Sequence, residues 1–253
     1  MISRALPAIV LLGLLVLAWQ LVALHNAFLI PRIGAIWAQL TNNPREFFDA
    51  AGVTLEECFV GLGASFVIAF SLAVAMTYVG LIERAVMPLA VILNVTPVVA
   101  LAPGLAIALG FGFTPRFLIT GIIVFFPLLV NSLVGLRSID PEALQYFRSL
   151  HASRREVLVH LRIPSSLPFL FAAARICFPL AIIGAVVSEF TTAGPGNING
   201  LGSLIEIGIG STELSVVYAA IFCLSLLGLA FTLVVVAIER RVLAWHPTAG
   251  PSA

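Results

Sequence analysis

Long apolar stretches separated by short polar segments dominate this chain. Each is close to the roughly 20 residues that a helix needs to cross about 30 Å of hydrocarbon. The pattern therefore predicts an all-α membrane protein of about six transmembrane helices. The apolar runs cover residues 5–24, 58–80, 85–109, 117–136, 167–187 and 216–238.

The third apolar run, residues 85–109, is interrupted by polar and helix-breaking residues. Pro88, Pro97 and Pro103 each lack a backbone donor, and Asn94 places an amide near the middle of the run. Irregular backbone at membrane depth survives only where protein or a water-filled cavity satisfies the freed carbonyl groups. We therefore expect this helix to be kinked or broken, and to border a pathway through the membrane.

Two other polar side chains are candidates for the same pathway. Asn131 lies in the middle of the fourth run, and Glu189 follows the fifth. An ionisable group in or beside a span suggests a functional site, because an isolated charge in hydrocarbon is costly. Interhelical hydrogen bonding is the alternative for the two asparagines, Asn94 and Asn131, and interfacial anchoring is the alternative for Glu189. The predicted pathway residues are Asn94, Pro97, Pro103, Asn131 and Glu189.

The segment between the first two runs is more polar. Turn residues surround one short amphipathic stretch at residues 33–40, which we place outside the bilayer. The sequence Thr54-Leu-Glu-Glu57 fits a capping box, in which Thr54 caps a helix and Glu57 bonds back to it. It predicts that the second span begins directly afterwards.

The composition agrees with a membrane protein and excludes several function classes. Hydrophobic residues make up 60% and charged residues 10% of the 253 positions, whereas soluble domains carry about 25% charged residues. A net charge of +1 argues against nucleic-acid binding, which requires a dense basic patch. The pattern contains no recognisable nucleophile and base, metal-ligand cluster or phosphate loop. The three cysteines are far apart and suit small buried hydrophobes: Cys58, Cys177 and Cys223.

The polar loop at residues 137–166 has helix signals throughout. Asp-Pro-Glu at residues 140–142 can cap and open a first short helix. Ser153-Arg-Arg-Glu156 is a capping box for a second helix, which we expect Pro164 to end. The two helices would meet at residues 151–152. Such an amphipathic hairpin can dock its apolar ridge into a groove on a partner or lie on the membrane surface, and the pattern itself leaves both open.

Arginines indicate the orientation of the chain, because they favour the cytoplasmic side of short loops. Six spans with a cytoplasmic N-terminus put nine arginines inside and three outside, so both termini are predicted to be cytoplasmic. The inside set is Arg4, Arg84, Arg137, Arg148, Arg154, Arg155, Arg162, Arg240 and Arg241, and the outside set is Arg32, Arg45 and Arg116.

The loop resembles the EAA loop of permeases in ATP-binding-cassette importers, through residues 140–154, 163–168 and 175–176. Two positions depart from the family pattern: Gln145 stands at the acidic place and His151 at the glycine place. With histidine there, we expect the backbone to lose a left-handed option. The resemblance implies that the loop docks on an ATPase through Glu142, Gln145, Leu150, His151, Ala152, Ser153, Arg154, Ile163, Pro164 and Pro168.

Further motifs extend the resemblance over about residues 54–241. Residues 96–103 with 110–112, residues 125–137, and Ser-Glu-Phe at 188–190 with Gly-Leu-Gly at 200–202 are similar to the sulfonate, nitrate and taurine importer permeases. The resemblance implies a type I importer permease (MetI-like) fold. The expected organisation is an N-terminal helix with an extracytoplasmic segment (1–53), a permease core (54–241) containing the coupling loop (137–166), and a short cytoplasmic tail (242–253).

The implied function is that of a permease subunit in the bacterial inner membrane, which carries a small solute such as a sulfonate, nitrate or taurine. A vitamin or pyrimidine precursor is the alternative substrate, and a secondary transporter driven by an ion gradient is the alternative mechanism. The expected partners are ATPase subunits, a substrate-binding protein, a second copy of the chain and membrane lipid, without nucleic acid. No cofactor is expected in this chain, and ATP and Mg would bind to the partner ATPase.

Overall fold

The computed structural model describes residues 2–26, 30–192 and 200–244. Throughout these residues the regular structure is helical. The elements are α1 (Ile2–His25), α2 (Ile33–Asn42), α3 (Pro44–Tyr78), α4 (Gly80–Val95), α5 (Val98–Leu109), α6 (Phe113–Arg137), α7 (Pro141–Ser149), α8 (Arg154–Val157), a π-helical turn η1 (Leu158–Arg162), α9 (Ile163–Thr192), α10 (Leu201–Gly210) and α11 (Leu214–Val242).

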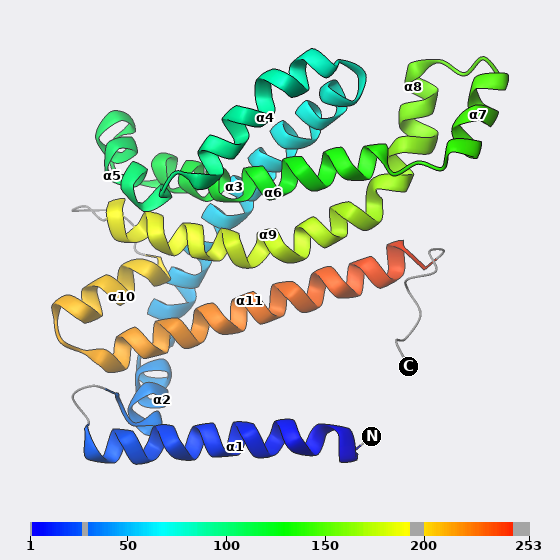
Figure 1. Cartoon of the computed structure of the whole chain (residues 1–253). Coiled ribbons are helices and arrows are strands. Elements are labelled where there is room, and N and C mark those ends of the chain that lie inside the picture. Colours follow the sequence, from blue (N-terminus) through cyan, green and yellow to red (C-terminus); the bar gives the residue numbers. More distant parts are fainter. Residues whose placement is uncertain (1, 27–29, 193–199, 245–253) are drawn as a thin grey trace.

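Helices α3, α6 and α9 form the centre of the molecule, and α11 lies alongside α9 (Figure 1). The short helices α7 and α8 project at one end, where α1 begins and α11 ends. We call this the hairpin end. Helix α10 lies at the opposite end, together with α2 and α5. We call this the α10 end. All long helices thus run between these two ends.

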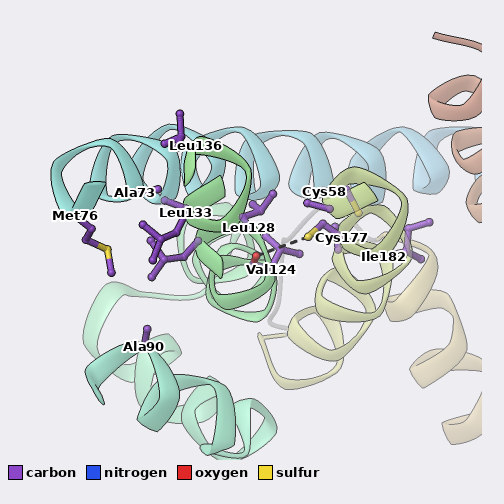
Figure 2. Packing of buried hydrophobic residues seen from close by; sticks show 14 of the residues in the cluster. Cys58, Ala73, Met76, Ala90, Val124, Leu128, Leu133, Leu136, Cys177 and Ile182 are labelled. Atoms are coloured by element: carbon purple, nitrogen blue, oxygen red, sulfur yellow. Dashed lines mark hydrogen bonds between the residues drawn. The ribbon is translucent and has the colours of Figure 1, made fainter. Parts of the chain in front are cut away.

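Small residues allow the central helices to approach closely. Figure 2 shows Cys58 of α3 and Cys177 of α9 beside Val124 of α6, and the Cys177 thiol donates to the Val124 carbonyl at 3.9 Å. A Cβ on Gly61 would lie 2.6 Å from the backbone oxygen of Phe117, so α3 and α6 are in contact there. In hydrocarbon, where the hydrophobic effect does not drive helices together, such close packing stabilises the bundle. As predicted, Cys58 and Cys177 are buried, while Cys223 is half-buried.

The prediction of an all-α membrane protein is confirmed. Within the described residues, α3, α6, the continuous stretch from Arg154 to Thr191, and α11 are long and apolar enough to cross a membrane. Helices α4 and α5 together make a fifth candidate span, bent by 99° at its break. Helix α1 covers the predicted first span. Its apolar part, from Gly13 to His25, is shorter than the four helical stretches named above.

The expected start of the second span was wrong. Helix α3 begins at Pro44, which occupies the favoured first position, and continues through Thr54 without interruption. Thr54 is fully buried in the middle of the helix, so it does not cap a helix end. Its hydroxyl instead donates to Glu189 of α9 at 2.7 Å. The local sequence resembles a cap, but the Thr54 hydroxyl bonds to a residue of another helix.

The expectation that Pro164 ends the second helix of the loop was wrong. The chain passes from α8 through η1 directly into α9, and Pro164 falls in the first turn of α9. The Ile163 amide donates to the Leu158 carbonyl five residues back, so the hydrogen-bond pattern shifts by one residue directly before Pro164. The second helix of the 137–166 loop and the fifth span are therefore joined without a break. Helix α10 is a further element that the hydrophobic pattern did not predict.

Candidate functional site

The hairpin α7–α8 has the helix starts that the sequence predicts. The Asp140 side chain accepts a hydrogen bond from the Glu142 amide at 2.9 Å, and Pro141 opens α7. At α8, the Ser153 hydroxyl accepts from the Glu156 amide at 3.3 Å, and the Glu156 carboxylate accepts from the Ser153 amide at 2.7 Å. These caps fix both helix starts by local contacts, so the hairpin is ordered before any partner binds.

The corner between α7 and α8 is built around a left-handed residue. His151 has φ 55°, its amide donates to the carbonyl of Arg148, and the amide of Ala152 donates to that of Phe147. These two bonds form a Schellman motif, whose left-handed position is usually glycine. The expectation that histidine would remove the left-handed conformation was therefore wrong. The turn hydrogen bonds hold His151 there, at a cost of about 1–2 kcal/mol relative to glycine.

Apolar side chains at this corner are open to solvent. Tyr146 is 62% exposed and Leu150 is 60% exposed, although both belong to a hairpin at the polar end of the molecule. The Tyr146 ring meets that of Phe147 edge to face, with centroids 6.5 Å apart. Glu142, Gln145 and His151 are exposed around them. A short apolar ridge with a polar rim is the composition of a protein docking surface.

The base of the hairpin is tied to the ends of the spanning helices. The Tyr78 hydroxyl at the end of α3 donates to the backbone oxygen of Arg154 at 2.9 Å. Arg162 lies over the Tyr78 ring, 5.6 Å from its centroid, and donates to the Leu136 carbonyl of α6 at 2.7 Å. The base of the hairpin is thereby bonded to α3 and α6, and it continues directly into α9.

A second set of contacts links the neighbouring helix ends. Arg137 at the end of α6 pairs with Glu83 of α4 at 2.6 Å, and also donates to the Met76 carbonyl of α3 at 3.2 Å. This ion pair is partly exposed, so its contribution to stability is small. Its importance is geometric, because it connects the broken span to the same helix ends that hold the hairpin.

The predicted break in the third span lies at Thr96 and Pro97, where α4 ends and α5 begins. The Thr96 hydroxyl donates to the Ile92 carbonyl at 2.7 Å, and the Thr96 amide donates to the same oxygen at 3.0 Å. Asn94, Pro97 and Pro103 are exposed on the surface of the single chain. A polar amide exposed at this depth needs a polar environment, because facing lipid is costly.

The other predicted residues lie apart from these two features. Ile163, Pro164 and Pro168 are half-buried where the hairpin joins α9. The Asn131 amide donates to the Pro127 carbonyl within α6 at 2.8 Å, while Glu189 is fully buried at the α10 end. Asn131 is half-buried and Glu189 is buried, whereas Asn94 is exposed on the surface of the single chain.

Sequence reasoning missed a buried ion pair. Glu57 had been assigned to a helix cap and Arg116 to an outer loop, yet they form a buried ion pair at 3.2 Å. The available signal was that both are charged residues at the edge of an apolar run. Among the described residues, no group of three or more His, Cys, Asp or Glu side chains is arranged to hold a metal ion.

Comparison with solved structures supports the fold. The chain resembles an inward-facing structure of the MetNI methionine ABC transporter with a TM-score of 0.62 at 18% identity, covering 76% of this chain and 96% of that one. Nearly the whole length of that chain is therefore matched, so the two chains share a fold.

Sequence comparison identifies the family. Residues 65–244 match the family model described as binding-protein-dependent transport system inner membrane component. The formylaminopyrimidine transport permease protein ThiX of Halalkalibacterium halodurans is 31% identical over 96% of this chain and 97% of its own. The taurine transport system permease protein TauC of Escherichia coli is 25% identical over 93% and 88%. The chain therefore belongs to the binding-protein-dependent transport system inner membrane components, and it is the permease subunit of an ATP-binding-cassette importer that works with a separate ATPase and a binding protein.

Proposed function

We propose that the α7–α8 hairpin is the element through which the ATPase drives this permease, and that two copies of the chain enclose the pathway. The observation that carries the proposal is the pairing of an exposed apolar ridge, Tyr146 and Leu150, with a base bonded to the ends of α3 and α6. A groove on each ATPase subunit accepts the ridge as a helix-in-groove contact.

The mechanism is a shift between two populated states. ATP and Mg bind to the partner ATPase, whose closure stabilises one position of the hairpin more than the other. Because Tyr78 and Arg162 join the hairpin to α3 and α6, these helices move with it. The access of the pathway then changes from the cytoplasmic side to the outer side, where the binding protein delivers the solute.

The orientation follows from this role. A hairpin that meets an ATPase lies in the cytoplasm, so the start of α1 and the end of α11, which share its end of the molecule, are cytoplasmic as well (Figure 1). The α10 end then faces the outside, and the lipid bilayer surrounds the long helices between. This orientation agrees with the excess of arginines on the same side.

The broken span is the proposed wall of the pathway. Asn94 is exposed next to a 99° bend, and a second copy of the chain packed on this face would shield it from lipid. Pro97 and Pro103 keep the backbone irregular there, which is tolerated where it lines a cavity. Asn131 and Glu189 bond within the chain, so we propose that they support the wall without lining it.

The substrate is a small solute, for which the relatives favour a nitrogen heterocycle. Identity is 31% to the formylaminopyrimidine permease and 33%, over 65% of this chain, to the riboflavin transport system permease protein RibX of Chloroflexus aurantiacus. It is 25% to the taurine and aliphatic sulfonate permeases TauC and SsuC. We propose a vitamin or pyrimidine precursor first, and a small sulfonate second.

Co-purification tests the proposal for the hairpin. Wild-type permease is expressed with the cassette ATPase encoded beside it, and compared with a variant carrying Glu142→Arg and Ala152→Asp. Glu206→Arg on α10 is the matched control, because Glu206 is an exposed glutamate at the other end of the molecule. We expect the hairpin variant to lose the ATPase while the control retains it. Equal binding by all three proteins would exclude the hairpin as the docking element.

The substrate is tested on the binding protein encoded with this permease. Its thermal unfolding is measured with a formylaminopyrimidine, riboflavin, taurine, an alkyl sulfonate and nitrate, and the stabilising compound is then used in transport into proteoliposomes. Stabilisation by a heterocycle alone supports the first proposal. Stabilisation by taurine or a sulfonate alone would replace it with the second.

A further inference from the structure

Three ionisable side chains are buried together at the α10 end, and none of them docks the ATPase or lines the proposed pathway. Glu57 of α3 and Glu189 of α9 have 0% exposure, and Arg116 of α6 has 2%. Arg116 pairs with Glu57 at 3.2 Å and donates through Nε to the Thr192 hydroxyl at 2.8 Å. Buried charges are costly unless they are paired and hydrogen-bonded. Their presence in three separate helices calls for a role.

Glu189 holds the beginning of α10. Its carboxylate accepts from the Ser203 amide at 3.0 Å and from the Thr54 hydroxyl at 2.7 Å, while Thr54 Oγ1 accepts from the Leu201 amide at 2.9 Å. Leu201 and Ser203 lie in the first turn of α10, whose amides have no partner within the helix. A carboxylate from α9 and a hydroxyl from α3 therefore act together as the cap of α10.

The two glycines around Leu201 make this contact possible. A Cβ on Gly200 would lie 2.3 Å from the Glu189 carboxyl group. A Cβ on Gly202 would lie 2.9 Å from Glu189 Oε2 and 2.9 Å from the Cα of Val186. The Gly-Leu-Gly sequence thus has a steric reason, because only glycine lets the start of α10 approach the carboxylate.

Helix α10 contributes to the electrostatics of the cluster. Two carboxyl groups lie near one guanidinium, and the amide end of α10 faces Glu189, where its partial positive charge favours an ionised carboxylate. Helix α10 has ten residues and is about 15 Å long, too short to span the membrane. Its position therefore depends on contacts with α3, α9 and α11.

We propose that Glu189 is a positioning residue that anchors α10, so that the α10 ends of α3, α6, α9 and α10 move as one unit during transport. The Glu57–Arg116 ion pair extends the unit to α6. This inference rests on the proposed transport cycle. It implies that the outer side of the pathway opens by movement between the two copies and that α10 does not swing away from its own chain.

Hydrogen exchange of the peptide that contains Leu201 and Ser203 tests the anchor directly, because these two amides are bound by Thr54 and Glu189. The variant is Glu189→Gln, which keeps the shape but removes the charge, and the matched control is Glu206→Gln on the exposed face of α10. Loss of one charged hydrogen bond is expected to raise exchange there by roughly tenfold or more. The control should exchange like wild type.

A second pair of variants tests the anchor independently if Glu189→Gln misfolds. Thr54→Val removes the bridging hydroxyl at nearly constant volume, whereas Thr54→Ser keeps it. We expect faster exchange in the valine variant and wild-type exchange in the serine variant. These measurements need only the permease, so they test the anchor even if no ATPase binds. Unchanged exchange in both Glu189→Gln and Thr54→Val would overturn the anchor.

The movement as one unit is tested in the wild-type complex with its ATPase and binding protein. Exchange of the same peptide is compared between the nucleotide-free complex and the complex trapped with ATP. Protection that persists in both states, together with reduced transport per ATP hydrolysed in Glu189→Gln at unchanged ATPase binding, is the expected result. Loss of protection in the trapped wild type would show that α10 swings as a separate gate and would overturn the inference.

Discussion

The strength of the hairpin contact is open to a quantitative test at Leu150. This side chain is 60% exposed in the free chain, and full burial of a leucine contributes about 2 kcal/mol. Covering the exposed part in an ATPase groove is therefore worth about 1.2 kcal/mol, most of which Leu150→Ala removes. Since 1.4 kcal/mol corresponds to a factor of ten, we expect about a fivefold weaker contact per hairpin. With two hairpins in the complex, the combined loss is about 25-fold.

The assay is equilibrium binding of the purified ATPase to permease in lipid nanodiscs, measured for wild type and Leu150→Ala. Ile207→Ala is the control, because Ile207 is 50% exposed on α10 at the opposite end and loses a similar amount of apolar surface. The thermal unfolding temperatures of all three proteins should agree within a few degrees. A dissociation constant for Leu150→Ala within twofold of wild type would refute the reasoning, because the ridge would then remain uncovered in the complex.

Three further outcomes follow from individual contacts. His151→Gly should relieve the left-handed backbone and raise the free energy of unfolding by about 1–2 kcal/mol. His151→Val should lower the free energy of unfolding and weaken ATPase binding, and equal stabilities would contradict the strain at φ 55°. Gly61→Ala should destabilise the bundle by about 1–3 kcal/mol, because its Cβ would meet a backbone oxygen at 2.6 Å. Gly63→Ala is the control: its Cβ would have no neighbouring atom within 4 Å, so this variant should unfold like wild type in detergent. In a cysteine-free chain, Asn94→Cys should react faster with a water-soluble maleimide than Ile92→Cys. Residue 92 is the control because it lies on a different face of α4. Equal reaction rates would place Asn94 outside the pathway.

Local sequence signals predicted the parts of this protein that depend on neighbours along the chain. The caps at Asp140 and Ser153 are formed as expected, because a cap needs only residues two or three positions apart. The break at Pro97 is local for the same reason, since a proline removes a donor from its own helix. Hydrophobic runs likewise located the spans, because the bilayer imposes their length.

Tertiary contacts decided what the sequence alone left undetermined. Thr54 has the sequence of a cap and Arg116 that of a loop, yet each binds a side chain more than 50 positions away. The existence of α10 was missed for the same reason, because the start of α10 depends on a carboxylate from another helix. In hydrocarbon, a polar group must find its partner within the protein. Sequence therefore determined which segments enter the membrane, and only the folded arrangement determined which of their polar groups meet.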